Sequence, residues 1–284
     1  MAQHQVRWPV SVMCAVLQVS RGGFYASVQR QAATCVGAEE IVLLVRVKAI
    51  AAETRYSYGS RRMAKQLRDD GFAVGRYKAR QLMRQAKITV QRPKKCHPLT
   101  TDSRHGYMVA PNLIARQFAV EQPDQVWVGD ITYVWTAEGW LYLAVLLDLY
   151  SRKVVGWAMS RRVDAALVQE ALQMALGRRK PAEGLIHHSD RGSQYACNAY
   201  QALLAEHGIR CSMRRKGDCL DNAVAERFFR SVKGERTSLQ QYIGRQEARD
   251  DVIDYIEMFY NSKRLHSYLG YVSPNDFEAL AKAA

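Results

Sequence analysis

The chain has 284 residues, of which 48% are hydrophobic, so it is long and apolar enough to bury a core and is not a disordered protein. Its 41 lysines and arginines outnumber 27 acidic residues, and the net charge of +14 indicates a polyanionic partner, either nucleic acid or an anionic membrane surface. At roughly 150 residues per domain, this length predicts about two domains.

The sequence argues against membrane insertion and against export. The longest apolar stretch spans 141–149 and Asp148 interrupts it, whereas a bilayer-spanning helix needs about 20 apolar residues. The N-terminus lacks a small-residue cleavage site, so we expect no signal peptide. The cysteines are scattered without C-x-x-C spacing, which is typical of reduced cytoplasmic thiols and not of disulfides or structural zinc; they are Cys14, Cys35, Cys96, Cys197, Cys211 and Cys219.

A strongly basic segment lies in the first third of the chain, after a short helical pair expected over 10–30. Residues 55–95 hold thirteen basic side chains against Asp69 and Asp70, so this segment carries +11 of the net +14. Such an asymmetry favours a dedicated nucleic-acid-binding module over a generally basic surface. We therefore expect an N-terminal helical region over 1–45 and a DNA-binding domain over 46–95.

Within the basic segment, the pattern predicts two helices joined by a tight turn. Ser60 can cap a first helix that ends at Asp70-Gly71, and a second helix is expected over 76–85. A helix, a glycine-containing turn and a helix are typical of a helix-turn-helix, although an ordinary solvated helical hairpin would show the same pattern. The side chains expected to contact DNA are Arg61, Arg62, Lys65, Arg76, Lys78, Arg80 and Arg84.

The second half of the chain has the pattern of an α/β domain. Four of the seven prolines fall within 91–124, which resists helix formation, so we expect a linker over 96–122. Three antiparallel strands followed by alternating helices and strands are the order of a ribonuclease H-like domain, expected over 123–238 with a helical extension over 239–284. The expected strands are 125–135, 140–149, 153–159, 185–188 and 209–213, and the expected helices begin after Asp164 and span 197–207, 223–233 and 246–260.

Three carboxylates stand out by their context. Asp130 lies inside an otherwise apolar strand, where an unpaired charge costs several kcal/mol and needs a cation or a strong partner. Asp190 ends the fourth strand, where open α/β sheets place ligands, and Glu226 lies in the first turns of a helix. Three such acids can hold two hard divalent ions, which activate one oxygen and stabilise another at a phosphodiester.

The acids and the motifs around them resemble a known family. Their separations, 59 and 35 residues, look like the D, D(35)E signature of retroviral-type integrases and DDE transposases. Longer motifs are more specific and resemble the OrfB product of the IS-three family of bacterial insertion sequences over nearly the whole chain. They are Tyr58-Gly59-x-Arg61-Arg62, Trp127-x-x-Asp130-Ile131-Thr132-Tyr133, Asp148-x-Tyr150-Ser151-Arg152, His188-Ser189-Asp190-Arg191-Gly192-x-Gln194-Tyr195 and Asp221-Asn222-Ala223-x-x-Glu226.

The resemblance implies a transposase that cleaves and joins the DNA ends of an insertion sequence. It implies that Asp130, Asp190 and Glu226 are the catalytic residues and hold two Mg²⁺ ions, for which Mn²⁺ can substitute. It also implies that Lys233 contacts the DNA end; two helical turns beyond Glu226, it shares that residue's helix face. The implied partners are terminal-repeat and target DNA, further copies of the chain, and the OrfA product or an OrfA–OrfB fusion, in the bacterial cytoplasm at the nucleoid.

Two other functions fit parts of the same pattern. A ribonuclease H-like nuclease would use the same acids but cut without joining. A DNA-binding repressor would use 55–95 alone, although intact acids at all three positions argue against it.

Several other conspicuous residues are expected to be structural. Asp148 lies near a strand end, where a turn role is expected, and Asn222 is expected to cap the Glu226 helix. For His187 and His188 we favour packing or hydrogen bonding over metal ligation. The remaining aromatic residues at strand or helix spacing are expected in the core; they are Trp127, Trp135, Trp140, Trp157, Tyr255, Phe259 and Tyr260.

Overall fold

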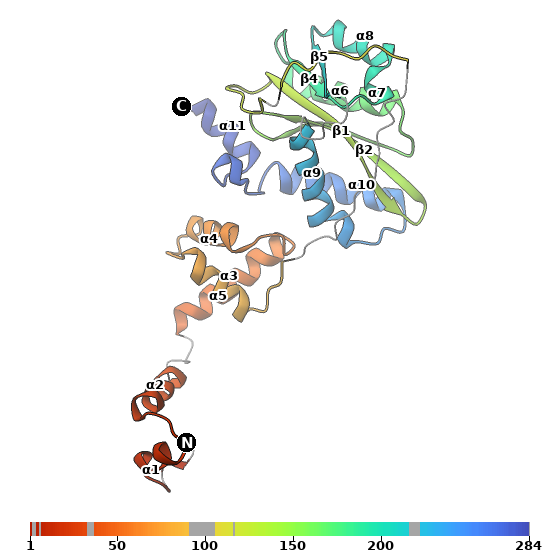
Figure 1. Ribbon diagram of the computed structural model, residues 1–284. Coiled ribbons are helices and arrows are strands. Elements are labelled where there is room, and N and C mark those ends of the chain that lie inside the picture. Colours follow the sequence, from red (N-terminus) through yellow and green to blue (C-terminus); the bar gives the residue numbers. More distant parts are fainter. Residues whose placement is uncertain are drawn as a thin grey trace.

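A computed structural model of the protein describes residues 1, 4–5, 7–32, 37–90, 106–115, 117–215 and 222–283 (Figure 1). Several residues singled out above lie outside the described residues: Cys35, Cys96, Cys219, Asp221 and part of the expected linker, 96–105. Among the described residues, Cys14, Cys197 and Cys211 are free thiols. No helix in the described part of the chain is long and apolar enough to cross a membrane.

The N-terminal part of the chain is helical, as predicted. A short pair, α1 (Val10–Val16) and α2 (Arg21–Ala32), precedes a three-helix unit. That unit consists of α3 (Ala38–Glu53), α4 (Ser60–Asp69) and α5 (Arg76–Gln85) and packs around buried side chains from each helix, among them Ile50, Met63, Leu67 and Leu82. The boundary expected between 45 and 46 falls inside α3.

The turn between α4 and α5 explains the helix ends. Gly71 has a φ of +91°, which favours glycine, and it closes α4 after Asp70 as predicted. The predicted Ser60 cap is wrong. Gly59 is the N-cap residue, its backbone is extended, and no side chain caps the helix.

A five-stranded sheet forms the centre of the second half. Its strands are β1 (Val126–Thr136), β2 (Gly139–Asp148), β3 (Val154–Ser160), β4 (Ile186–Ser189) and β5 (Arg210–Met213). The order across the sheet is β3-β2-β1-β4-β5, in which β1, β2 and β3 are antiparallel and β1, β4 and β5 are parallel. This is the mixed sheet predicted for a ribonuclease H-like domain.

Helices cover both faces of this sheet (Figure 1). One face packs on α6 (Ala165–Arg179), α7 (Ser193–Ala196) and α8 (Asn198–Glu206) through a core that includes Trp127 and Tyr200. The other face packs on the C-terminal helices, and the same buried core continues from there into the α3–α5 unit. The C-terminal elements are α9 (Ala223–Glu235), the 3-10 turn Thr237–Leu239, α10 (Arg245–Asp254) with a π-helical continuation over Tyr255–Tyr260, the 3-10 turn Ser267–Leu269, and α11 (Pro274–Ala283).

Three of the residues expected to be structural have defined positions. Asp148 is fully buried and accepts hydrogen bonds from the backbone N–H groups of Asp124 (2.7 Å) and Tyr150 (2.6 Å), so it holds the end of β2. His188 Nδ1 lies 2.8 Å from the Ser212 hydroxyl inside the core. Asn222 occupies the N-cap position of α9, but its side chain forms no capping hydrogen bond there.

The aromatic residues do not all lie in the core. Tyr255, Phe259 and Tyr260 are buried, and so is Trp127, as predicted. The core prediction is wrong for Trp135 and Trp140, which are 60% and 42% exposed. Both lie at the end of the long β1–β2 hairpin, which extends past the pairing with β4 (Figure 1).

The approach of β1 to β4 depends on Gly129, one residue before Asp130. A Cβ atom at Gly129 would lie 2.7 Å from Nε2 of His187, so only glycine leaves room for that ring. His187 is fully buried, and its Nε2 lies 3.2 Å from the hydroxyl of Tyr200. In the Gly-Asp sequence on β1, Gly129 therefore permits the close packing of His187, and Asp130 is the first of the three acids.

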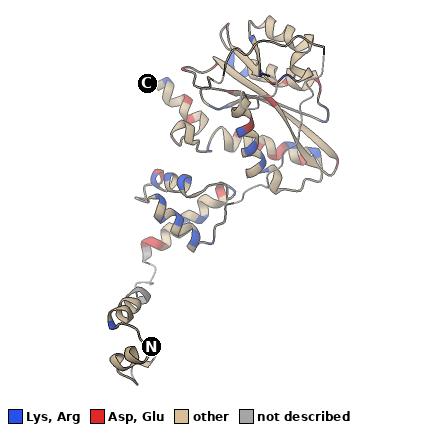
Figure 2. Ribbon diagram, in the orientation of Figure 1, with Lys and Arg blue, Asp and Glu red and all other residues tan. Residues whose placement is uncertain are grey.

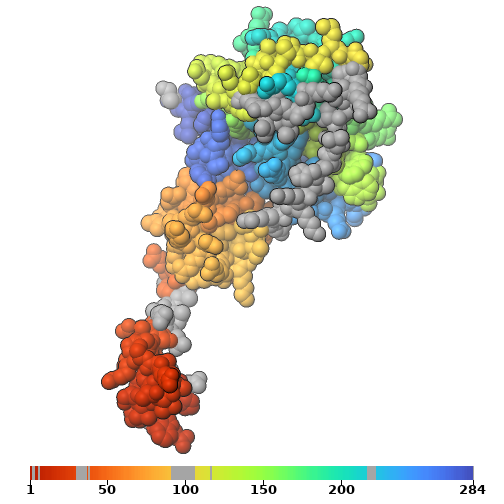
Figure 3. All heavy atoms as spheres, in the orientation of Figure 1, coloured from red at the N-terminus to blue at the C-terminus, as the bar shows by residue number. Residues whose placement is uncertain are grey.

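The α3–α5 unit is fastened to the C-terminal helices by Tyr58 and by ion pairs, a set of contacts that we call the seam. Tyr58 is 2% exposed; its hydroxyl donates to the carbonyl of Lys263 (3.2 Å) and accepts from the N–H of Leu265 (2.9 Å). Arg55 pairs with Asp251 at 3.0 Å, and Arg62 lies 3.8 Å from Glu235. Figure 3 shows the surface of this unit, in orange, against the blue surface of the C-terminal part.

We predict that Tyr58→Phe weakens the seam. The substitution removes two hydrogen bonds and leaves the buried N–H of Leu265 without its partner, which costs about 1–3 kcal/mol. Urea unfolding of the full chain measures the loss. Tyr56→Phe, at a 43% exposed neighbouring tyrosine, is the control and leaves the free energy of unfolding unchanged. Equal stability of both variants would contradict the role of Tyr58.

We also predict that His187 makes a contribution to stability that is lost in mild acid, opposite in sign to the contribution of Asp130, whose pKa is raised. Burial lowers the pKa of this imidazole to about 3, so the folded state keeps it neutral while the unfolded chain protonates it below about pH 6.5. The stabilisation is present above pH 6.5 and is lost progressively as the pH falls toward 3, by about 1 kcal/mol between pH 7 and 5.5.

The measurement is urea unfolding at both pH values. His187→Gln removes this contribution, so its change in stability between the two pH values differs from that of the wild type by about 1 kcal/mol, whereas His207→Gln, at an exposed histidine, matches the wild type. An unchanged dependence in His187→Gln would show that other groups are responsible.

Candidate active site

Asp130 and Asp190 lie at the same level of two adjacent parallel strands. Val128 pairs with His188 in the β1–β4 register, and each aspartate follows its own member of that pair by two residues. Because parallel strands keep their register along the ladder, the two carboxylates lie side by side where β4 ends. The sheet thus joins two predicted site residues that are 60 positions apart in the chain.

Asp190 and Glu226 both influence the charge of Asp130. Burial raises the pKa of this carboxyl to about 8, and the negative charges of Asp190 and Glu226 contribute to the rise. The N–H of Ile131, which donates to Oδ1 at 2.8 Å, and the charge of Arg214 act in the opposite direction. Asp130 therefore lies in a partly buried environment with excess negative charge.

The turn after β4 fixes the carboxylate of Asp190. The N–H of Gly192 donates to Oδ1 at 2.8 Å, and a Cβ atom at Gly192 would lie 3.0 Å from the same oxygen. On the other side, Nη2 of Arg214 lies 4.0 Å from Oδ2. The Asp-x-Gly sequence thus orients Asp190 through the backbone.

Arg214 is a site residue that the sequence pattern did not single out. It directly follows β5, whose last residue pairs with Ser189, so Arg214 lies level with Asp190 in the next parallel strand. Its carbonyl accepts from Nε of Arg191 at 2.6 Å, which ties the ends of β4 and β5 together. The strand-end rule that found Asp190 would also have found Arg214 if it had been applied to the last strand.

Glu226 comes from the helix that packs against β1. α9 buries Phe228 and Val232 in the core on that face of the sheet, while Glu226 in its first turn is exposed. The structure brings Glu226 close enough to influence the charge of Asp130. Within the described residues, however, no three His, Cys, Asp or Glu side chains are arranged to hold a metal ion as they stand.

The three candidate ligands are of the chemical type that binds a hard divalent cation. All three candidates are carboxylates, the ligand type that Mg²⁺ prefers. Burial is the main cause of the raised pKa of Asp130, and the negative charges of Asp190 and Glu226 add a repulsion that a cation between these acids would relieve. The described side chains of His187 and His188 are engaged inside the core with Tyr200 and Ser212.

Lys233 lies on the same helix as Glu226, near the hairpin. Its ammonium group sits over the ring of Tyr133, 4.3 Å from the centroid. The cation is thus held beside β1, three residues along that strand from Asp130.

The basic side chains expected to contact DNA divide into two groups. Arg61, Arg76, Arg80 and Arg84 are exposed on α4 and α5, and Figure 2 shows basic positions along both helices. Arg62, Lys65 and Lys78 form ion pairs with Glu235, Asp69 and Glu40.

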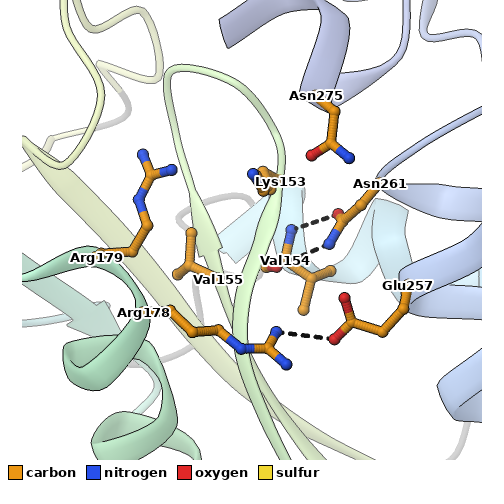
Figure 4. A pocket seen from close by; sticks show the side chains of 8 residues that line it. All are labelled: Lys153, Val154, Val155, Arg178, Arg179, Glu257, Asn261 and Asn275. Atoms are coloured by element: carbon orange, nitrogen blue, oxygen red, sulfur yellow. Dashed lines mark hydrogen bonds and ion pairs between the residues drawn. The ribbon is translucent and has the colours of Figure 1, made fainter. Parts of the chain in front are cut away.

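A pocket elsewhere in the fold is structural (Figure 4). It has a volume of about 250 Å³ and lies between β3, α6 and the C-terminal helices. Asn261 bridges to both backbone groups of Val154 at 3.0 Å, and Arg178 pairs with Glu257 at 2.8 Å. These side chains are engaged in joining the sheet to the C-terminal part.

The sequence matches two known kinds of domain. Residues 38–95 match the HTH-like domain family, and residues 120–219 and 207–274 match two integrase core domain families. Among solved structures, the integrase catalytic core domain of HTLV-2 in complex with magnesium is 14% identical, with a TM-score of 0.45 over 56% of this chain and 99% of that one.

Relatives match over nearly the full length. The chain is 40% identical to the transposase InsF for insertion sequence IS3A of Escherichia coli (strain K12), over 97% of this chain and 96% of that protein. It is 42% identical to an uncharacterized 31 kDa protein of insertion element IS600 from Shigella sonnei, over 93% and 97% of the two chains. The chain therefore belongs to the IS3 family of insertion-sequence transposases, with a ribonuclease H-like integrase core and an N-terminal HTH-like domain.

Proposed function

We propose that the chain cleaves the ends of its insertion-sequence DNA and joins them to a second DNA site, using Asp130, Asp190 and Glu226. The observation that carries this proposal is the register of β1 and β4, which puts two of these acids side by side, with the third on the helix packed against β1. Family membership supplies the reaction class, a phosphodiester transesterification.

The residues of the site divide the work between holding cations and holding DNA. Magnesium ions bound by the three carboxylates would supply an activated oxygen nucleophile and would stabilise the leaving oxygen. The Gly192 N–H keeps Asp190 oriented for this role, and the Ile131 N–H does the same for Asp130. Lys233 neutralises a phosphate of the DNA end beside β1. No covalent link between protein and DNA is needed.

Glu226 must approach the two aspartates when the site is loaded. The described side chains do not yet form a three-ligand metal site, and Glu226 is exposed at the start of α9. We infer that cation and DNA binding draw this carboxylate inward, since each removes part of the repulsion among the three acids.

DNA binding is assigned to the α3–α5 unit. Arg76, Arg80 and Arg84 on α5, with Arg61 on α4, form an exposed basic surface suited to phosphate contacts at the terminal repeat. Further copies of the chain and an OrfA product are the proposed protein partners.

The acids are tested with Asp190→Asn. We expect nicking and joining of labelled terminal-repeat DNA in Mg²⁺ to fall by about 100-fold or more, because losing a carboxylate ligand removes several kcal/mol of transition-state stabilisation. DNA binding persists, which shows that the variant is folded. The matched control is Glu170→Gln, an equal charge change at an exposed position on α6, and it retains activity.

Three results would contradict this assignment. An Asp190→Asn variant that still nicks and joins would remove the acid from the reaction. Cleavage without any joined product in the wild type would favour a structure-specific nuclease. Terminal-repeat binding with no Mg²⁺-dependent cleavage would favour a repressor.

The basic surface is tested by salt dependence. Arg76→Ala combined with Arg80→Ala weakens binding to terminal-repeat DNA and lowers the slope of log K against log salt by about 0.9 for each phosphate that the protein no longer neutralises. Lys282→Ala, an exposed cation near the end of α11, serves as the control and keeps the slope. A slope unchanged in the double variant would place the DNA elsewhere.

A further inference from the structure

The β1–β2 hairpin carries a cluster of aromatic side chains on one face, which we call the aromatic face: Tyr133, Trp135, Trp140 and Tyr142. Trp135 pairs with Trp140 in the antiparallel register, and Tyr133 pairs with Tyr142, so the four side chains share one side of the hairpin. The Trp135 and Trp140 rings are 4.7 Å apart between centroids, and Tyr133 and Trp140 are 4.8 Å apart, all edge-to-face.

This face is open to solvent although the opposite face is covered. Val134 and Leu141 point the other way, into the core shared with α10, and are buried. Trp135 and Trp140 remain 60% and 42% exposed. A group of exposed tryptophans on a rigid hairpin marks a binding surface, because single-chain proteins rarely leave such surface uncovered.

Cations border the aromatic face on both sides. The Lys233 ammonium group lies over the Tyr133 ring at the β1 side. On the β3 side, Tyr142 pairs with Ser160, and the exposed Arg161 and Arg162 follow directly. An apolar protein partner would offer no counter-charge to these cations. A nucleic acid strand, in contrast, presents bases that can contact the rings and phosphates that can pair with the cations.

The aromatic face also lies near the acids along β1, although Asp130 has the parity of Val134 and starts from the opposite face of the sheet. Past Val128, the last residue that pairs with β4, Lys233 of the helix that carries Glu226 contacts the Tyr133 ring, so the two faces meet at this part of β1. Tyr133 and Trp135 follow Asp130 on the same strand by three and five residues. At a rise of about 3.3 Å per residue, they lie roughly 10 and 17 Å from it, a distance spanned by a few nucleotides.

We propose that the aromatic face stacks unpaired nucleobases of the DNA strand that leaves the three acids, so that the end of the duplex is held open beside them. Aromatic side chains bind bases of any sequence through their π-faces, and flanking cations hold the backbone. The proposal rests on the proposed function, since it takes DNA at the acids as given. It assigns a ligand, single-stranded DNA, to residues outside the three acids.

The experiment compares two DNA probes with the full-length chain in EDTA, so that no cleavage occurs. One probe is a terminal-repeat duplex with a single-stranded overhang of about five nucleotides, and the other is the blunt duplex. The wild type prefers the overhang probe by about tenfold, and its tryptophan fluorescence is quenched on binding. Combined Trp135→Ala and Trp140→Ala substitutions abolish both the preference and most of the quenching while blunt-duplex binding is unchanged.

Two controls separate stacking from folding. Trp135→Phe with Trp140→Phe keeps most of the preference, because phenylalanine retains a π-face. Trp8→Ala, at a 54% exposed tryptophan in the N-terminal region, keeps all of it.

Several outcomes would overturn the proposal. These are a wild type without overhang preference, an alanine variant that retains it, and an equal loss of blunt-duplex binding. A change of oligomeric state in the alanine variant, seen by light scattering, would make this face an interface between copies instead. If the wild type fails to cleave in Mg²⁺ but the alanine variant still loses overhang preference, the proposed function fails and the stacking surface stands.

Discussion

The site depends on like charges held together at the end of parallel strands. β1 and β4 keep Asp130 and Asp190 at one level, and burial together with the neighbouring acids raises the pKa of Asp130 to about 8. Arg214, which directly follows β5, offsets part of this repulsion, and its Nη2 lies 4.0 Å from Oδ2 of Asp190. A cation bound between these acids would relieve the repulsion.

α9 connects the charged site to the DNA-binding unit. Glu226 lies at its start, Lys233 two turns later, and Glu235 at its end, where Arg264 pairs with it at 2.6 Å and Arg62 lies 3.8 Å away. A movement of the α3–α5 unit on DNA would therefore act on the helix that carries the third acid. The Tyr58-Gly59-x-Arg61-Arg62 motif contributes to two surfaces. Arg61 is exposed on α4, while Tyr58 and Arg62 face the seam.

The sequence predicted the architecture because the relevant signals are local. Apolar strands, a proline-rich boundary and glycine-ended helices define the elements, and parallel pairing then dictates that strand-end acids meet. The role of Arg62 was not predictable in this way, since it depends on Glu235, which is distant in the sequence. Helical spacing placed Arg62 on a basic helix, but only tertiary packing shows that it faces Glu235.

The tryptophan error has a different cause. A strand alternates between two faces, and β-propensity is as high for an exposed tryptophan as for a buried one, so pattern alone cannot separate Trp127 from Trp135. Both have the parity of the same sheet face, yet Trp127 lies where β4 and the helices beyond it cover the sheet, and Trp135 lies past the end of β4. The hairpin thus continues the apolar sheet face past the region that the helices cover. The exposed surface lies a few residues along β1 from Asp130, where a ligand with flat apolar faces and a charged backbone can cover it.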